Sequence, residues 1–304
     1  MDKEEKITYV SDIDKPDDNV VQTFQLVSSS LRGRIVRLGS DLDKIITDHN
    51  YPDLVTSLFS EVVALTVMLS SMLKYEGIFT LQIQGDGILK MLVCDVTADG
   101  NIRGCANFDK EAIENTKLTK TDLKELFGKG YMAFTVDRPG ARDPYQGIVE
   151  IKGESLVDAV QHYFNQSEQI GTGIKLEVDK VDGKWRAGAL MLQHMPEEGN
   201  NIAQGVGNAI EDNWRRAMIL METCTKEELI DPNLHSNILL RRLFHEEGIR
   251  VYEPYNVKAK CRCSKEKVEN VISVIPEEER EEMSEDGKII ITCEFCSKDY
   301  YFDI

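Results

Sequence analysis

Hydrophobic residues follow two different periods along the first two thirds of the chain. Between residues 55 and 73 they recur every three or four positions, which indicates a mostly buried helix that ends before Gly77. Shorter strand-like segments follow at residues 79–84, 89–96, 132–138, 148–152 and 184–193. This mixture predicts an α+β fold, with a sheet-and-helix core over residues 21–200 that is not a repeated βαβ array.

The pattern becomes entirely helical after Pro196. Thr225 and Glu228 form a capping-box pattern for a short helix, and another helix is expected from Leu234 to Glu247. These pieces predict a helical linker over residues 201–250. Its first helix carries an apolar stripe that consists of Ile202, Val206, Ile210, Trp214, Ala217 and Met221.

The two ends of the chain differ from the core. Residues 1–20 are acidic and lack the basic start and apolar segment of a secretory signal, so a flexible leader is expected. Residues 251–304 contain two short predicted helices, which begin after Ser264 and Pro276, but few aliphatic side chains. Because a unit of about fifty residues with so small a core is marginal alone, another interaction must hold it together.

Charge and composition exclude several classes of function. The chain has 304 residues and a formal net charge of -17, which disfavours nucleic acid or an anionic membrane as the main partner, because both require a basic patch. No run of about 18 apolar residues occurs. The five histidines show no catalytic spacing. We therefore expect a cytoplasmic protein that is not an enzyme.

Four of the seven cysteines are clustered near the C-terminus. They form the pairs Cys261-x-Cys263 and Cys293-x-x-Cys296, with 29 residues between the pairs. Zinc binds four thiolates tetrahedrally, and such a site contributes an apparent ~10 to 16 kcal/mol of folding free energy at neutral pH. We therefore predict that these four residues bind one zinc ion, which holds residues 251–304 together.

The same sulfurs are candidates for redox chemistry. Zinc keeps them as thiolates, the form that oxidants attack, and each pair is able to close on itself. Because a Cys-x-x-Cys ring is less strained than a Cys-x-Cys ring, Cys293 and Cys296 are expected to pair before Cys261 and Cys263. Two alternatives remain open at this point: an interaction module with a permanent structural zinc, and a thiol oxidoreductase that uses Cys293 and Cys296.

Other residues with possible chemistry are interpreted as structural. Cys94, Cys105 and Cys224 are expected to be small core residues and not additional redox sensors. Glycine-containing segments at 85–87 and 171–173 lack the spacing of a phosphate-binding loop and are expected to be turns.

The cysteine motifs and their surroundings resemble a known family, the redox-regulated 33 kDa heat-shock proteins. The similarity extends from the C-terminal unit through the linker into the core. The matching segments are Cys261-Arg262-Cys263-Ser264, Cys293-Glu294-Phe295-Cys296, Tyr300 to Asp303, Leu243 to Glu247, Gly85-Asp86-Gly87, Arg103-Gly104 and Tyr145-Gln146-Gly147.

This resemblance implies a stress-response chaperone that holds unfolding proteins without ATP. The reduced protein would carry zinc on the four thiolates and be inactive. Oxidation would form the disulfides Cys261–Cys263 and Cys293–Cys296, expel zinc and unfold the C-terminal unit. The linker would then loosen, and the active protein, a homodimer, would bind unfolding client proteins through newly exposed apolar surface.

Overall fold

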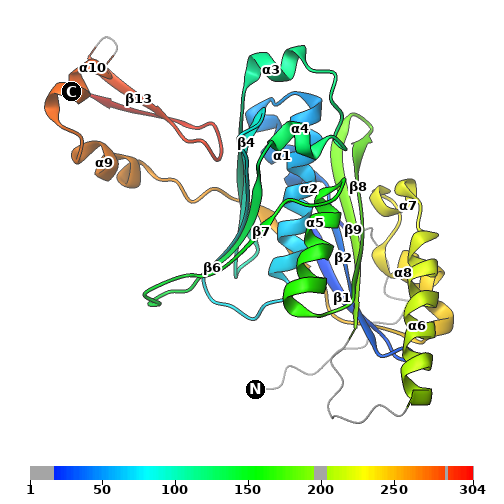
Figure 1. Ribbon diagram of the computed structural model, residues 1–304. Coiled ribbons are helices and arrows are strands. Elements are labelled where there is room, and N and C mark those ends of the chain that lie inside the picture. Colours follow the sequence, from blue (N-terminus) through cyan, green and yellow to red (C-terminus); the bar gives the residue numbers. More distant parts are fainter. Residues whose placement is uncertain (1–16, 195–203, 285–286, 304) are drawn as a thin grey trace.

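Two large sheets, a set of helices and a small hairpin make up the structure (Figure 1). The computed structural model describes residues 17–194, 204–284 and 287–303, and in helix α6 it describes side chains from Glu211 onward. Most of the acidic leader expected for residues 1–20 therefore lies outside the described residues. The combination of mainly antiparallel sheets with separate helices confirms the predicted α+β class.

The first sheet has the strand order β10-β1-β2-β9-β8, with β11 also paired to β1. Its strands are β1 (Val20–Leu26), β2 (Leu31–Leu38), β8 (Thr172–Val181), β9 (Lys184–His194), β10 (Ile249–Val251) and β11 (Tyr255–Asn256). All of their pairings are antiparallel. The sheet therefore combines the start of the chain with a segment more than two hundred residues later.

The second sheet has the order β12-β5-β4-β3-β6-β7. Its strands are β3 (Ile78–Gln84), β4 (Leu89–Thr97), β5 (Asn101–Phe108), β6 (Tyr131–Asp137), β7 (Tyr145–Glu150) and β12 (Lys258–Ala259). The predicted segments coincide with β3, β4, β6 and β9 to within one residue at each end, and β7 begins three residues earlier than predicted.

Helix α2 (Asp53–Ser70) lies between the two sheets (Figure 1). It packs on β2, β8 and β9 of the first sheet and on β3, β4 and β5 of the second, and 15 of its 18 residues are buried. Within the described residues it is the one helix long and apolar enough to cross a membrane, yet 83% of it is buried inside the protein. Apolar side chains all round the helix are explained by a sheet on either side.

Shorter helices connect the strands of the core. These are α1 (Ser40–His49), α3 (Lys110–Asn115), α4 (Leu123–Phe127) and α5 (Leu156–Tyr163), the last of which continues into a π-helical turn at Phe164–Glu168. The C-terminal unit contains α9 (Lys265–Ser273), α10 (Glu277–Glu282) and the hairpin of β13 (Lys288–Thr292) with β14 (Asp299–Asp303).

The linker forms three helices that cover the outer face of the first sheet (Figure 1). They are α6 (Gln204–Glu222), α7 (Lys226–Ile230) and α8 (Ser236–Phe244), followed by a 3-10 turn at His245–Glu247. Thr225 accepts from the backbone N–H of Glu228 at 3.2 Å, which confirms the predicted capping box. Gly248 follows with a φ of 65°, a left-handed conformation that suits glycine at the end of a helix.

Side chains of the first sheet alternate between two apolar cores. In β9, Met191 faces the core around α2, whereas Leu190 and Leu192 face the linker. On the linker side, the ring of Phe24 stacks on the ring of Phe244 in α8, with 5.9 Å between centroids. The linker therefore hides an apolar sheet face that is as fully buried as the central core.

The predicted apolar stripe of α6 takes part in this packing. Ala217 and Met221 are fully buried against the sheet, and Trp214 packs at the edge of the same cluster. The remaining stripe residues, Ile202, Val206 and Ile210, lie outside the described side chains.

Residues 249–259 form a strap that joins the linker to the cysteine motifs. The strap contributes β10 and β11 to the first sheet beside β1, and β12 to the second sheet beside β5. It therefore touches both layers before it reaches Cys261. The proposed division into a leader (1–20), core (21–200), linker (201–250) and zinc-binding unit (251–304) stays a prediction.

A buried carboxylate fixes the end of the linker to the core. Glu247 is 2% exposed and accepts hydrogen bonds from the hydroxyls of Ser28 and Ser29, at 2.9 and 3.1 Å, in the turn between β1 and β2. Arg216 of α6 donates to the same carboxylate at 2.5 and 3.1 Å. One side chain thus ties the first linker helix and the last linker turn to the same hairpin.

We expect Glu247→Gln to loosen the linker without unfolding the core. The change removes the charge that Arg216 faces, at a cost of about 2 kcal/mol. Hydrogen exchange in α8 measures this loss. Glu246→Gln, on the exposed neighbour, is the control, and equal exchange rates in the two variants would contradict the assignment.

The same carboxylate gives this contact a defined pH dependence. The hydrogen bonds from Arg216, against the opposing effect of burial, hold the pKa of Glu247 below its ordinary value. The stabilisation is therefore complete above the pKa of a free glutamate, about 4.3, and is lost as pH falls through the lower folded value.

Candidate metal centre

The structure brings the four clustered cysteines together. Cys261 and Cys263 lie between β12 and α9, and Cys293 and Cys296 lie in the turn between β13 and β14. Their four sulfurs are all within 4.8 Å of one another, with 3.8 Å between Cys261 and Cys293 and 3.5 Å between Cys263 and Cys296.

These separations fit a tetrahedral metal site. Four sulfurs at a Zn–S distance of about 2.3 Å are about 3.8 Å apart along each edge of the tetrahedron, whereas a disulfide requires about 2.05 Å. All four cysteines are free and half-buried. The donor set and its spacing therefore suit zinc, which stays a prediction together with the ligand roles of these residues.

Backbone hydrogen bonds shape the Cys293-to-Cys296 turn. The carbonyl of Cys293 accepts from the N–H of Cys296 at 3.3 Å and of Ser297 at 2.8 Å, and the N–H of Cys293 donates to the carbonyl of Lys298 at 2.9 Å. Ser297 has a φ of 53°, which reverses the chain into β14. The hairpin thus turns both sulfurs toward the same point.

The Cys261-to-Cys263 segment is held differently. Ser264 directly follows it and caps α9 by accepting from the N–H of Lys267 at 3.3 Å, as predicted. The ammonium of Lys267 reaches back to the carbonyl of Arg262 at 2.8 Å. The start of α9 therefore fixes the backbone of this pair from one side.

Tyr300 supports the cluster from outside the four sulfurs. Its hydroxyl donates to the sulfur of Cys263 at 3.1 Å. Burial opposes ionisation of Cys263, but hydrogen bonds from Tyr300 and the neighbouring thiols outweigh it and lower the pKa of this thiol to about 7. The sequence singles out Tyr300 only as part of a segment that resembles the family, and its contact with Cys263 becomes visible once the hairpin of β13 and β14 places it beside the cluster.

Two other thiols of the cluster, Cys293 and Cys296, ionise less readily. Burial is the main factor that raises the pKa of both Cys293 and Cys296. A bound metal ion keeps its thiol ligands deprotonated. Zinc binding by these thiols near pH 7 would therefore displace protons, and the affinity would fall as the pH is lowered.

The three remaining cysteines lie apart from the cluster. Cys94, Cys105 and Cys224 are buried, and burial raises the pKa of each thiol, to about 12 for Cys105 and about 11 for Cys224. Buried thiols of this kind react slowly with oxidants. Their placement agrees with the interpretation as core residues.

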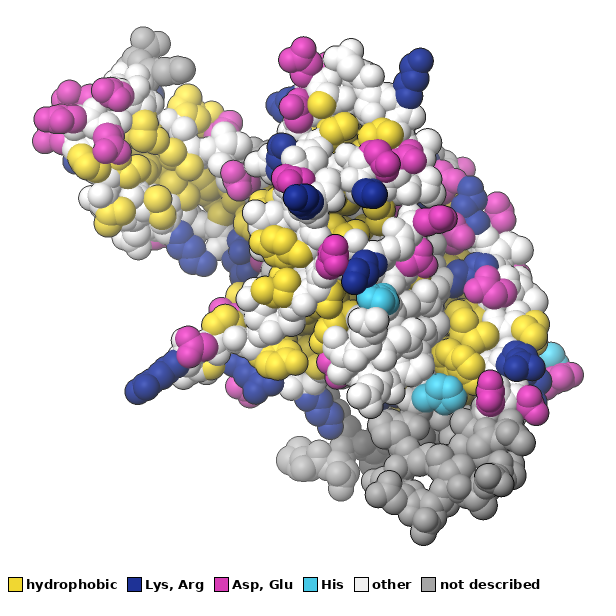
Figure 2. Space-filling model, viewed as in Figure 1, with side chains coloured by type: hydrophobic (Ala, Val, Ile, Leu, Met, Phe, Trp, Pro, Cys, Tyr) yellow, Lys and Arg dark blue, Asp and Glu magenta, His cyan; other side chains and the backbone are white. Residues whose placement is uncertain are grey.

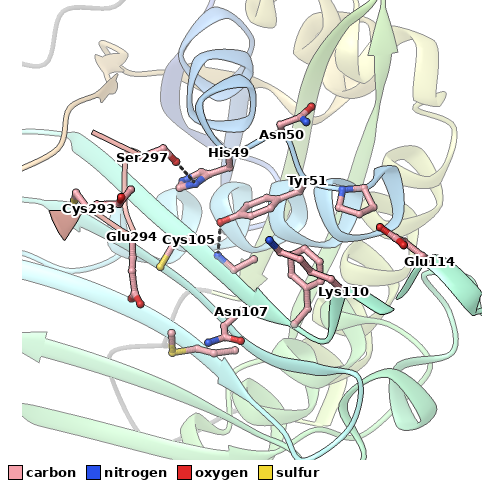
Figure 3. A pocket seen from close by; sticks show the side chains of 15 residues that line it. His49, Asn50, Tyr51, Cys105, Asn107, Lys110, Glu114, Cys293, Glu294 and Ser297 are labelled. Carbon is pink, nitrogen blue, oxygen red and sulfur yellow. Dashed lines mark hydrogen bonds between the residues drawn. The ribbon is translucent and has the colours of Figure 1, made fainter. Parts of the chain in front are cut away.

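A cavity of about 600 Å³ lies at the junction between the cysteine turn and the core (Figure 3). Cys293, Glu294 and Ser297 line one side, and His49 and Cys105 line the other. The Ser297 hydroxyl and the Nδ1 atom of His49 are hydrogen-bonded at 3.2 Å across the junction. The cysteine turn is therefore docked against α1 and β5, a contact that the sequence pattern does not predict.

We expect Tyr300→Phe to weaken zinc binding by about tenfold at pH 7, the lower end of the effect typical of groups that orient metal ligands. Without the hydroxyl, the pKa of Cys263 rises and one more proton competes with the metal. Competition with a chromophoric chelator measures the affinity. Tyr301→Phe, on the exposed neighbour, is the control, and an unchanged affinity in Tyr300→Phe would contradict this role.

Comparison with known proteins agrees with this architecture. The chain matches the Hsp33 protein family over residues 19–303. It is 38% identical to the 33 kDa chaperonin of Caulobacter vibrioides over 293 residues, which cover 94% of this chain and 95% of that protein. It is 34% identical to the 33 kDa chaperonin of Escherichia coli strain SMS-3-5 over 289 residues, which cover 95% and 93%.

A solved structure shares the fold. The crystal structure of the 33 kDa chaperonin from Thermotoga maritima matches with a TM-score of 0.75 and 21% sequence identity, over 94% of this chain and 95% of that one. The family match extends from the first strand of the core to the last strand of the hairpin. The chain therefore belongs to the Hsp33 family of chaperones.

Proposed function

We propose that this protein is a redox-regulated holdase, which binds unfolding proteins without ATP after it has been oxidised. The observation that carries the proposal is the joint arrangement of four reduced sulfurs within 4.8 Å and a linker that covers an apolar sheet face. Oxidants react with the four sulfurs, and the apolar sheet face is a surface that the linker would expose after such a reaction.

In the reduced state the four thiolates would hold zinc, and the linker would stay closed. Side chains from β1, β2 and β9 meet those of α6, α7 and α8 in one apolar cluster. Its residues are Phe24, Leu26, Leu31, Ile35, Leu190, Leu192, Ala217, Met221, Cys224, Leu229, Leu239, Leu240, Leu243 and Phe244. An apolar surface of this size, once uncovered, would suit the apolar segments of an unfolding client.

Oxidation would remove all four ligands. Closing Cys261 with Cys263 and Cys293 with Cys296 forms two S–S bonds and releases four electrons. Two molecules of hydrogen peroxide accept these electrons with four protons and become four molecules of water. The pairing follows from the resemblance to the family, and the pair Cys293 and Cys296 is expected to close first.

Loss of the ligands would unfold the C-terminal unit because little else supports it. Beyond Cys261, the described residues with buried apolar side chains are Ile272, Ile289 and Tyr300. α10 buries none of its side chains. Burial of about three side chains contributes a few kcal/mol, far less than the ~10 to 16 kcal/mol of a four-thiolate zinc site.

The remaining properties follow from family membership and charge. We propose a cytoplasmic protein that is not an enzyme, has unfolding proteins as partners and forms a homodimer when oxidised. A net charge of -17 disfavours nucleic acid and anionic membranes as partners.

Treatment with peroxide or hypochlorite tests the switch directly. We expect oxidation to release zinc, consume four free thiols and then suppress the light scattering of a heat-unfolding client. Oxidised protein that kept its zinc, or that protected no client, would refute the proposal and favour a permanent structural zinc. Catalysed disulfide exchange in a third protein would favour a thiol oxidoreductase.

A linker variant separates client binding from oxidation. Leu240 is fully buried against the sheet, and Leu240→Glu places a charge there at a cost of several kcal/mol. We expect this variant to protect the client while its cysteines remain reduced and zinc-bound. Ile238→Glu changes a residue of the same helix that is 44% exposed, and it should stay inactive until oxidised. Activity in both variants, or in neither, would contradict the closed-linker model.

A further inference from the structure

The residue between Cys261 and Cys263 is anchored in the core. Both terminal nitrogens of Arg262 donate to the carboxylate of Asp95 in β4, at 2.5 and 2.8 Å. Asp95 is 4% exposed, and two parallel bonds of this kind fix the orientation of both groups. The backbone just before the arginine is also fixed on the core, since Lys260 donates its N–H to the carbonyl of Ile102 in β5 at 2.9 Å.

The residues between Cys293 and Cys296 reach the same network. Arg103 lies opposite Asp95 in the β4–β5 ladder and donates to its carboxylate at 2.9 Å. The guanidinium of Arg103 also lies over the ring of Phe295, 3.9 Å from its centroid. A cation in this position attracts the face of the ring electrostatically.

We propose that Asp95 is the docking residue of the C-terminal unit and that, with Arg103, it positions both cysteine pairs on the core. One carboxylate holds Arg262 directly and Phe295 through Arg103, so a single buried charge connects the interior of each cysteine motif to the second sheet. We call the set of Asp95, Arg103, Arg262 and Phe295 the docking network.

The docking network depends on the metal-bound arrangement of the sulfurs. Arg262 and Phe295 each lie between two cysteines of the cluster, so the backbone that directs them toward the core is the backbone that the four sulfurs would hold in place. Closing Cys261 with Cys263 would force the residue between them into a strained, smaller ring. Arg262 would then be unable to keep two parallel bonds to Asp95.

Loss of the contact between Arg262 and Asp95 would affect the linker through the strap, residues 249–259. β12 pairs with β5 immediately before Cys261, and β10 and β11 pair with β1, which carries Phe24 of the linker interface. Each of these strands is only two or three residues long. The network thus supplies a route by which the ligand state is transmitted to the apolar face under the linker. This route rests on the proposed function, whereas docking itself does not.

Hydrogen exchange on the reduced, zinc-loaded full chain tests the docking. We expect Asp95→Asn and Arg262→Met each to raise exchange in β5 and in the Cys293-to-Cys296 turn by about tenfold, because a partly exposed pair is broken on one side. Zinc content should remain one per chain. The double variant should exchange no faster than Asp95→Asn alone, since that change already removes the partner of Arg262.

Two matched controls accompany these variants. Asp99→Asn removes an exposed carboxylate from the turn after β4, and Lys260→Met removes an exposed cation next to Cys261. Both should exchange like the unaltered protein. If Asp95→Asn did not fold, Arg262→Met alone would decide, because its side chain is 23% exposed and lies at the surface of the core.

Removing zinc from the reduced protein with a chelator tests whether docking at Asp95 depends on the metal-bound cysteines. In the unaltered chain, removal should raise exchange in β5 to the level of Asp95→Asn, and in that variant it should add little at this strand. The proposal would be overturned if hydrogen exchange in β5 were unchanged in both single variants, or in the zinc-free unaltered chain. Client protection is measured separately, so a failure of the chaperone function leaves the docking result readable.

Discussion

In the proposed zinc-bound state, the C-terminal unit would depend on four sulfur atoms more than on its apolar core. The unit contains two short helices and one hairpin, and its helix α10 contributes nothing to a core. A site of four thiolates holds the two halves of such a unit together, since each cysteine pair comes from a different half. Oxidation of the sulfurs would therefore break the main stabilising interaction of the unit, and on the proposed function a redox change would act as a folding change.

The core has the opposite character. α2 is buried by sheets on both sides, and the first sheet has a second apolar face under the linker. If the linker helices detach as proposed, the sheet would keep the apolar core on its other side and with it its structure. The same sheet can then present Phe24, Leu190 and their neighbours as an ordered surface. One side of the first sheet thus stabilises the core, and the other side would be the surface that binds clients.

Local sequence patterns predicted the elements whose signals are local. The stripe in α6, the capping box at Thr225 and the serine cap of α9 all depend on residues within a few positions of one another. The structure contains both caps and, among the described side chains, the C-terminal half of the stripe. The cysteine spacing likewise indicated one cluster. By contrast, no individual strand was predicted before residue 79, although β1 and β2 lie at the centre of the first sheet.

The reason is visible in β2, whose sequence carries three arginines. Arg37 is buried and donates to backbone carbonyls of Glu228 and Asp231, which lie at and just after α7, about 190 residues later in the chain. A pattern that scores arginine as exposed cannot find such a strand, because the partner that permits burial is distant in sequence.

The same limit applies to the charges that attach the C-terminal half to the core. Asp95 meets Arg262 across 167 positions, and Glu247 meets Ser28 across 219. Both carboxylates are almost fully buried, so each requires its partners to remain in place. They lie at opposite ends of the segment that contains the strap, one beside the last linker turn and one beside the first cysteine pair. Between them the chain is held by strands of two or three residues, each too short to persist alone. The strap is therefore secured at its ends and by single contacts between them, such as the buried side chain of Val257 and the hydrogen bond from the N–H of Ala259 to Asp41. Loss of the end nearer the cysteines removes one of these attachments.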